Sequence, residues 1–373
     1  MATYKIPMSL PDIDDTDIEG VIEVVRSGRV ALGPKTEEFE HKMTEYIGCK
    51  HAVAVNSGTA ALHLIVKSLC IGNDDEVIVP SFTFAASVNA ILYEGAIPVF
   101  VDITNDTYNL DPSSVERNIT TKTKAIMAVD VFGHPAEWDE LLRIAKKHDL
   151  KLIDDSCEAI GAEYKGRKLG PFGDAGAFAF YPNKQMTTGE GGIIVTDNDE
   201  IARLCRSMRN QGRVDMSAWL EHPRLGYNYR IDELSASLGI TQLNRIEEFI
   251  SKREIVAQKY NARFRQFDWV QIPVVRPEVR MSWFVYVVTL REGLNRDEII
   301  INMEQSGVPA RGYFSPIHQQ KYIRDMFGDL SENVPVTESV ATRTLALPFH
   351  NNLTDEEIDT VVEVLKDAVM KHA

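Results

Sequence analysis

The chain has 373 residues, a length that predicts one large and one smaller domain. Hydrophobic residues make up 44% and charged residues 25%, a balance typical of a soluble globular protein. The formal net charge is −15 and no strongly basic stripe offsets it, so binding to nucleic-acid phosphates is not expected. Cys49, Cys70, Cys157 and Cys205 lie far apart without a C-x-x-C pair, which favours free thiols in a reducing cytoplasm and predicts neither a disulfide nor a metal site.

The N-terminal sequence MATYKIPMSLPDIDD has no basic stretch followed by an apolar run, so no signal peptide is expected. The most apolar long segment, residues 81–101, is interrupted by Asn89, Glu94 and Pro98. These interruptions predict that the segment does not span a membrane. A cytoplasmic location is therefore expected.

Short β-rich runs alternate with helical stretches from about residue 52. The expected strands are HAVAV (51–55), EVIVP (76–80), IPVFVD (97–102), KAIMAVD (124–130), KLIDD (151–155), AGAFAF (175–180) and GGIIVTD (191–197). The expected helices lie within 56–69, near 85–90, within 135–149 and from about Asp199. Apolar strands alternating with amphipathic helices indicate an α/β fold with a mostly parallel sheet between helices.

The alternation stops near residue 230. One long helix or two abutting helices are expected at 232–264, a strand at 282–290, and helices near 296–305 and 354–371. These elements indicate a smaller C-terminal α/β domain. We predict a large domain over 1–240, including the N-terminal segment, and a small domain over 241–373.

The common catalytic motifs are not found. No G-x-G-x-x-G follows a strand, and G-x-x-x-x-G-K-[ST], H-E-x-x-H and G-x-S-x-G do not occur. The usual routes to dinucleotide binding, nucleotide hydrolysis, zinc chemistry and serine catalysis therefore lack support.

Asn56-Ser57-Gly58-Thr59 lies between a strand and a helix. A glycine with hydroxyl neighbours at a helix N-terminus offers backbone N–H groups, side-chain donors and the positive end of the helix dipole, which suit a phosphate. Simple capping of the helix by Ser57 or Thr59 explains the pattern equally well.

The segment KLIDDSCEAIG (151–161) places two carboxylates at the expected end of a strand. Ligands bind at the carboxyl ends of parallel strands, so Asp154 or Asp155 is expected to face a cleft. Capping or a turn is the alternative.

Lys184 lies in AFAFYPNKQMTTGEGG (177–192), just after another predicted strand. A lysine near aromatic side chains is partly removed from water, which favours the nucleophilic amine; a plain loop lysine is the alternative. A nucleophilic lysine, a carboxylate and a phosphate site along one sheet edge together favour pyridoxal 5′-phosphate (PLP) as the cofactor.

The chain resembles the DegT/DnrJ/EryC1/StrS family of PLP-dependent sugar aminotransferases of fold type I over nearly its whole length. The motifs that carry the resemblance are GPKTEEFE (33–40), NSGTAAL (56–62), PSFTFAAS (80–87), DDSCEAIGAEY (154–164), FYPNKQMTTGEGG (180–192) and GYNYRIDELSASLGITQL (226–243). The resemblance implies a fold type I large domain, a smaller C-terminal domain and a homodimer with shared active sites.

The resemblance also implies roles for individual residues. Lys184 would form the Schiff base with PLP and move a proton between donor and cofactor, and Asp155 would face the pyridine nitrogen. The other implied cofactor contacts are Ser57, Gly58 and Thr59 at the phosphate, Phe84 on the ring face, Glu158 beside the phenolic oxygen, and Asn228 reaching the phosphate from the partner subunit.

The sequence departs from the family at Ala179, where relatives commonly carry a serine that donates to the phosphate. Relatives that are sugar dehydratases carry histidine in place of the lysine, so Lys184 favours transamination. Glu158 and HPRLGYNYR (222–230) resemble GDP-perosamine synthases, which implies a nucleotide-linked 4-keto-6-deoxyhexose as acceptor and L-glutamate as donor.

Four residues are implied at the substrate: Arg230 for a donor carboxylate, and Arg311, Tyr313 and His318 in ARGYFSPIH (310–318) for the acceptor. A surface loop and interdomain salt bridges are the alternative for these residues. Another acceptor, such as a different keto sugar or a cyclitol, dehydratase chemistry, and a non-catalytic regulator of the same fold also stay open.

Overall fold

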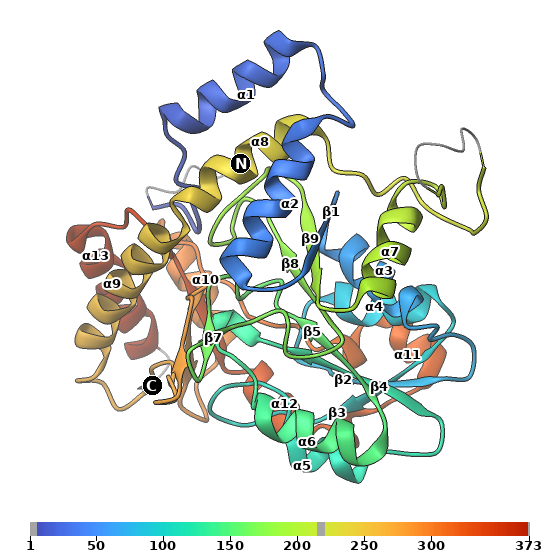
Figure 1. Ribbon diagram of the computed structural model, residues 1–373. Helices are drawn as coiled ribbons and strands as arrows, with labels where there is room; N and C mark the ends of the chain where they lie inside the picture. Colours follow the sequence, from blue (N-terminus) through green and yellow to red (C-terminus); the bar gives the residue numbers. More distant parts are fainter. Residues whose placement is uncertain (1–5, 215–220, 372–373) are drawn as a thin grey trace.

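A mixed, mostly parallel sheet forms the centre of the protein. The computed structural model describes residues 6–214 and 221–371 (Figure 1). The strands, in spatial order, are β1 (His51–Val55), β9 (Gly192–Thr196), β8 (Ala175–Ala179), β5 (Lys151–Asp155), β4 (Thr123–Val129), β2 (Glu76–Pro80) and β3 (Ile97–Val101). Only β9 runs against its neighbours β1 and β8, while the other neighbouring pairs are parallel.

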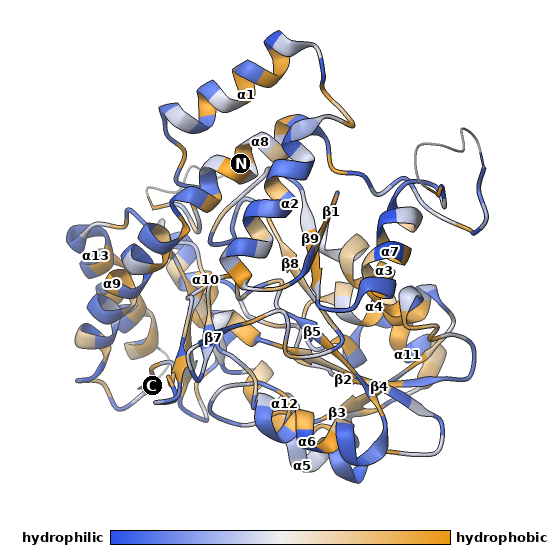
Figure 2. Cartoon of the chain, in the orientation of Figure 1, coloured by the Kyte–Doolittle hydropathy of each residue, from blue (hydrophilic) through white to orange (hydrophobic). Residues whose placement is uncertain are grey.

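Helices cover both faces of this sheet, as the sequence predicts. The helices around it are α1 (Asp15–Ser27), α2 (Pro34–Ile47), α3 (Gly58–Ser68), α4 (Ala85–Tyr93), α5 (Pro112–Arg117), α6 (Trp138–His148), α7 (Asp199–Arg209) and α8 (Glu233–Asn244). Hydrophobic side chains of α3, α4 and α7 pack on one face, and those of α2, α5, α6 and α8 pack on the other. The strands are accordingly the hydrophobic centre of Figure 2, with hydrophilic residues on the outer faces of the helices.

The strand directions bring several loops to one edge of the sheet. Because β9 is antiparallel to both β1 and β8, strands β1, β8 and β5 all point the same way. The residues that follow them are Asn56–Thr59, Phe180–Lys184 and Ser156–Glu158. Parallel strands present their carboxyl ends at one edge, so these three segments meet there.

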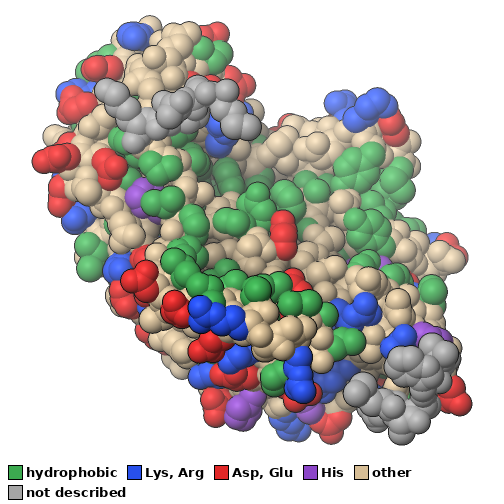
Figure 3. All heavy atoms as spheres, turned by 90° about the horizontal axis from the view of Figure 1, so that it is seen from above, with side chains coloured by type: hydrophobic (Ala, Val, Ile, Leu, Met, Phe, Trp, Pro, Cys, Tyr) green, Lys and Arg blue, Asp and Glu red, His purple; other side chains and the backbone are tan. Residues whose placement is uncertain are grey.

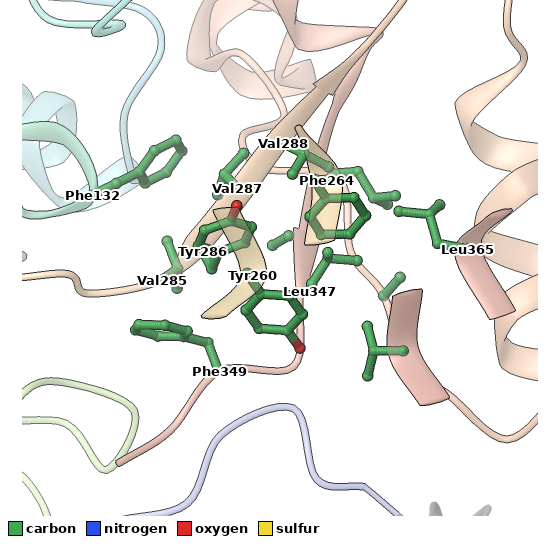
Figure 4. Close-up of a cluster of buried hydrophobic side chains, with 14 of the residues drawn as sticks. Phe132, Tyr260, Phe264, Val285, Tyr286, Val287, Val288, Leu347, Phe349 and Leu365 are labelled. Carbon is green, nitrogen blue, oxygen red and sulfur yellow. The ribbon is translucent and has the colours of Figure 1, made fainter. Parts of the chain in front are cut away.

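A second α/β unit follows α8. Its sheet has the order β10 (Val270–Gln271), β12 (Tyr286–Leu290) and β13 (Thr344–Leu347), and its main helices are α9 (Ile246–Phe264), α10 (Arg296–Gln305) and α13 (Asp355–Met370). Figure 4 shows aromatic and aliphatic side chains of these elements, among them Tyr260, Phe264 and Tyr286, packed in one cluster. Phe132 of the large unit belongs to the same cluster, so the two units share a continuous core.

The helical region 232–264 is two abutting helices, α8 and α9, separated at Arg245. The strand expected at 282–290 is shorter, because Trp283 has a left-handed backbone (φ 56°). The Phe284 N–H donates instead to the Phe132 carbonyl at 3.0 Å. The segment 282–284 is thereby bound to the loop after β4.

The chain crosses between the two units more than once. The Phe349 N–H donates to the carbonyl of Met8, so the N-terminal segment lies on the C-terminal unit. In the other direction, α11 (Lys321–Phe327) lies against α4 through a hydrogen bond from Tyr322 to Asn89. The boundary at 240/241 stays a prediction.

The remaining α-helix and strands are α12 (Pro335–Ala341) and a small sheet in the order β11 (Val279–Arg280), β6 (Glu163–Tyr164) and β7 (Arg167–Lys168). Within residues 6–214 and 221–371, the helices are too short or too polar to cross a membrane.

Candidate active site

Lys184 lies in the turn that follows β8. Phe180 is fully buried at the end of the strand, and its carbonyl accepts hydrogen bonds from Thr187 and Thr188, which close the TTGEGG turn behind the lysine. The Lys184 Nζ lies 3.5 Å from Oε1 of Glu158 and 3.7 Å from the centroid of the Phe284 ring. Its side chain is 12% exposed, which places the amine inside the protein and not on an open loop.

Glu158 holds its carboxylate beside this amine. Its Oε2 accepts a hydrogen bond from the Phe132 N–H at 3.1 Å, which fixes the orientation of the carboxylate. Burial raises the pKa of Glu158, while the positive charge of Lys184 acts in the opposite direction.

Asp155 reaches the same space from the end of β5. Its Oδ2 accepts from the Ser87 hydroxyl at 2.6 Å, and its Oδ1 accepts from the Cys157 N–H at 3.2 Å. Burial raises the pKa of Asp155, and the hydrogen bond from Ser87 and the charge of Lys184 oppose this shift. The Asp155 carboxylate and the Lys184 amine therefore attract each other at this edge of the sheet.

Asp154 lies on the other side of the sheet. Its Oδ2 accepts from the Gly170 N–H at 2.7 Å, and the Ser156 hydroxyl lies 2.6 Å from its Oδ1 and 2.7 Å from Oδ2 of Asp130. Burial and the charge of Asp154 raise the pKa of Asp130. The contacts of Asp154 therefore indicate a role in holding the fold together, and Asp155 is the carboxylate that lies on the same side as Lys184.

The N-terminus of α3 is the third part of the site. Ser57 is the N-cap, and its hydroxyl oxygen accepts from the Ala60 N–H at 3.1 Å, so its side chain is used in capping. The N–H groups of Gly58 and Thr59 lie in the first turn, where a helix offers them no acceptor. A Cβ on Gly58 would lie 2.7 Å from the Cβ of Ala179, so glycine permits this close approach of α3 to the end of β8.

Tyr313 is the residue from ARGYFSPIH that packs near the aromatic neighbour of the lysine, Phe284. Its ring centroid lies 5.9 Å from that of Phe132 and 6.4 Å from that of Phe284. Burial, together with the negative charge of Glu158, raises the pKa of the Tyr313 hydroxyl.

His318 does not line an open site. It is 1% exposed, its Nδ1 lies 2.6 Å from the Ser81 hydroxyl, and its Nε2 lies 2.7 Å from Oε1 of Glu338. Because both ring nitrogens are engaged inside the protein, the expectation of a substrate contact is corrected to a structural role that holds this segment at the end of β2.

The remaining candidates lie at the surface or in local contacts. Arg311 is exposed and forms an ion pair with Glu304, and Arg230 donates to the Asn210 side chain at 3.0 Å. Phe84 is 65% exposed at the N-terminus of α4. Asn228 is also exposed, and its carbonyl accepts from the Asn56 side chain at 3.4 Å.

No sequence pattern predicts that four further residues contact Lys184, Asp155 or Glu158: Ser87, Phe132, Phe284 and Arg253. Phe132 and Phe284 come from loops whose meeting depends on the tertiary fold. Arg253 lies within an ordinary helical pattern, and no local signal distinguishes it from a surface arginine.

The donor set fits PLP. An amine can form the Schiff base, a buried carboxylate can face a ring nitrogen, and a helix N-terminus can receive a phosphate. All three lie at one edge of the sheet, in an arrangement that the parallel strands produce.

Comparisons with known proteins agree with this chemistry. The GDP-perosamine synthase of Caulobacter vibrioides is 37% identical over 371 residues, covering 98% of this chain and 99% of that protein. The structure of Helicobacter pylori PseC, an aminotransferase involved in the biosynthesis of pseudoaminic acid, has a TM-score of 0.93 and 28% identity, covering 98% and 99% of the two chains. The PLP form of the putative sugar aminotransferase Spr1654 from Streptococcus pneumoniae has a TM-score of 0.93 and 29% identity, covering 99% and 100%.

The fold and the cofactor chemistry are those of a PLP-dependent transaminase of fold type I. Residues 11–366 match the DegT/DnrJ/EryC1/StrS aminotransferase family, and the chain belongs to it. It is a sugar aminotransferase whose substrates are a keto sugar and an amino donor.

Proposed function

We propose that the chain transfers the amino group of L-glutamate to GDP-4-keto-6-deoxymannose and forms GDP-perosamine. The observation that carries this proposal is Glu158, whose carboxylate lies 3.5 Å from the Lys184 amine at a position where many relatives carry glutamine. Similarity to a GDP-perosamine synthase along almost the whole chain supports the same substrate. The proposed role is in polysaccharide biosynthesis such as that of an O-antigen, and the four free cysteines favour the cytoplasm as its location.

In this proposal Lys184 and Asp155 do the chemical work. PLP supplies an electron sink and carries the amino group between the two substrates. The Lys184 Nζ would hold PLP, and it would take and return the proton that moves during amino transfer. The Asp155 carboxylate, fixed by Ser87 and the Cys157 N–H, holds a proton on the ring nitrogen.

The phosphate is proposed to lie at the N-terminus of α3. The N–H groups of Gly58 and Thr59 would donate to it, and the helix dipole would add to the attraction. Ser57 would contribute as the N-cap that holds the first turn of α3 in place. Phe84 would stack on the cofactor ring. Its 65% exposure is consistent with a position against a ligand or another subunit.

We further propose a homodimer in which Asn228 reaches the partner's phosphate. Several large hydrophobic side chains are exposed, among them Leu32, Tyr181 and Leu225, and Figure 3 shows hydrophobic side chains gathered around a hollow on one face. Exposed hydrophobic area of this kind is typical of a surface that another protein covers.

Tyr313 is the best-supported substrate residue, because its ring packs near those of Phe132 and Phe284 and the charge of Glu158 acts on its hydroxyl. Arg230 is proposed to meet the donor carboxylate, and Arg311 the acceptor. His318 is not carried forward, because its ring is buried and engaged.

The experiment that tests the substrate uses enzyme first loaded with an amino group from L-glutamate. GDP-, UDP- and dTDP-linked keto sugars are then added singly, and the rate at which each removes the amino group is followed by absorbance. GDP-4-keto-6-deoxymannose is expected to react fastest and to give the 4-amino sugar by mass spectrometry. Faster reaction with a UDP- or dTDP-linked sugar, a 3-keto sugar or a cyclitol would contradict this acceptor and identify the sugar that reacts. The similarity to PseC, an aminotransferase of pseudoaminic acid biosynthesis, is the reason to include other keto sugars in the test.

A further inference from the structure

Arg253 is a buried arginine that binds backbone carbonyl groups. It lies on α9 and is 3% exposed. Its Nη1 donates to the carbonyls of Trp283 and Phe284, both at 3.1 Å, and its Nη2 donates to the carbonyl of Lys184 at 3.1 Å. One guanidinium thus joins the turn that carries the lysine to the segment before β12.

These hydrogen bonds link the backbone of Lys184 to the backbone of Phe284, whose ring contacts the lysine amine. The Phe284 ring lies 3.7 Å from the Nζ of Lys184, and the carbonyls of the same two residues are held by Arg253. Gln185 adds a second link, since its side-chain amide donates to the Glu158 carbonyl at 2.6 Å and to the Ser282 hydroxyl at 2.8 Å. The backbone positions of the lysine, its carboxylate neighbour and its aromatic neighbour are therefore fixed to one another.

The arrangement is costly for the folded protein. A buried guanidinium is stabilised best by a contacting carboxylate, whereas the acceptors of Arg253 are neutral carbonyls and its Nε has no partner among the described residues. Burial lowers the pKa of Arg253 to about 10, and the charge of Asp12 only partly opposes this effect. Costs of this kind are expected where function, and not stability, sets the requirement.

We propose that Arg253 is a positioning residue: by holding the carbonyls of Lys184 and Phe284, it fixes where the Lys184 amine stands relative to Glu158 and the Phe284 ring. The proposal rests on the proposed function of Lys184. The role requires the planar fork of arginine, because its Nη1 and Nη2 atoms reach carbonyls in two different segments, whereas all three N–H groups of lysine are on one nitrogen.

The test compares Arg253→Lys and Arg253→Met with the wild type and with Arg245→Met as control. Arg245 stands just before α9, is largely buried and forms ion pairs with Asp14 and Asp17, so its loss destabilises the protein away from the site. Arg253→Lys keeps the charge and most of the volume, which protects the fold, and it isolates the loss of geometry. Thermal unfolding records the stability of each variant.

Two readouts report on the amine. The first is the pH midpoint at which the visible band of the PLP-loaded enzyme titrates, and we expect both Arg253 variants to shift it by about half a pH unit or more. The second is the rate at which an acylating reagent labels Lys184 in cofactor-free protein, quantified by peptide mass spectrometry. We expect the rate of Lys184 labelling to change at least about threefold in both Arg253 variants and to stay the same in Arg245→Met. The reason is that misplacement of a reacting group by about 1 Å has large kinetic effects.

Unchanged midpoint and labelling in both Arg253 variants would overturn the proposal, and so would equal changes in Arg245→Met. Failure of the proposed function looks different, because wild-type enzyme with PLP would then give no visible band. In that case the labelling rates of cofactor-free protein still decide whether Arg253 positions Lys184.

Discussion

Asp154 and Asp155 are adjacent on β5, yet their carboxylates lie on opposite faces of the central sheet. Asp155 accepts from Ser87 on the α4 side, whereas Asp154 accepts from Gly170 and contacts Ser156 on the other side. Successive side chains of a strand alternate between faces, so a two-residue motif that is ambiguous in the sequence has two distinct environments in the fold.

This separation predicts different outcomes for two conservative substitutions. Asp155→Asn is expected to fold normally and lose most of the transamination rate, about 100-fold or more, because the negative charge that we propose to face the ring nitrogen is removed. Asp154→Asn is expected to lose about 1–3 kcal/mol of stability, because its amide cannot accept all the hydrogen bonds that the carboxylate accepts. Steady-state rates and urea unfolding of both variants measure the contrast; full activity in Asp155→Asn would contradict the role proposed for Asp155.

The Asp130–Asp154 pair predicts a pH dependence of stability. Burial raises the pKa of Asp130 above its value in the unfolded chain, so the folded state binds the proton more tightly. Its contribution is fully present below about pH 4 and is lost as the pH rises through the folded pKa. Asp130→Asn keeps the hydrogen-bonding pattern of the protonated acid but cannot ionise, so its stability relative to wild type should increase from pH 5 to pH 8 in urea unfolding.

Glu116 provides a control, because its pKa is shifted in the opposite direction from that of Asp130. Lys147 and Arg143 lower the pKa of Glu116 to about 2, so its favourable contribution is present above about pH 4.5 and is lost as the pH falls towards 2. Glu116→Gln should therefore show no trend between pH 5 and pH 8. A falling difference in stability between Asp130→Asn and wild type over this range would contradict the raised pKa of Asp130.

Ala179 predicts a gain of cofactor affinity by substitution. It lies against Gly58 at the N-terminus of α3, where a hydroxyl can reach the proposed phosphate position. Ala179→Ser is expected to tighten PLP binding about fivefold, the value of one added hydrogen bond of about 1 kcal/mol. Gly58→Ala is the opposite control, since its Cβ would press on Ala179 and Cys157 and should weaken binding; fluorescence titration with PLP measures both, and unchanged affinity in both would remove the phosphate from this position.

The proposed shared active site predicts complementation between inactive variants. Lys184→Ala and Asn228→Asp are each expected to be nearly inactive alone, the second because a carboxylate repels the phosphate. If Asn228 acts across the dimer, a mixed dimer has one site with both native residues, and co-refolding should restore up to about a quarter of wild-type activity, since half of a random mixture is mixed dimers with one active site of two. No restored activity in a purified mixed dimer would show that Asn228 acts within its own subunit.

The elements that the sequence predicts best are those with strong local patterns. The seven central strands and α3, α6, α7, α10 and α13 carry apolar runs or amphipathic periodicity that fix their type. The strand at 282–290 was overestimated, because pairing of Phe284 with Phe132 overrides a β-rich sequence. Helices α1 and α2 were not singled out, although the capping box at Asp14 is a local signal that could have located the first.

The site divides in the same way. Lys184, Asp155, Glu158 and Gly58 follow strands whose direction is predictable, so their meeting at one edge follows from the topology. Arg253 and Phe284 reach the lysine only through the packing of the C-terminal unit on the large one, which no local pattern encodes. His318 had the residue type of a catalytic group, and only its burial revealed the structural contacts.

The absorbance spectrum of the purified protein with PLP, before and after L-glutamate, tests the central claim most directly, with Lys184→Ala as the paired control. We predict a visible band in the wild type that glutamate replaces by a near-ultraviolet band, and neither the band nor turnover in Lys184→Ala. A visible band that ignores glutamate would contradict the proposed donor. A wild type without the band, or a Lys184→Ala variant with near-normal turnover, would contradict the assignment of Lys184.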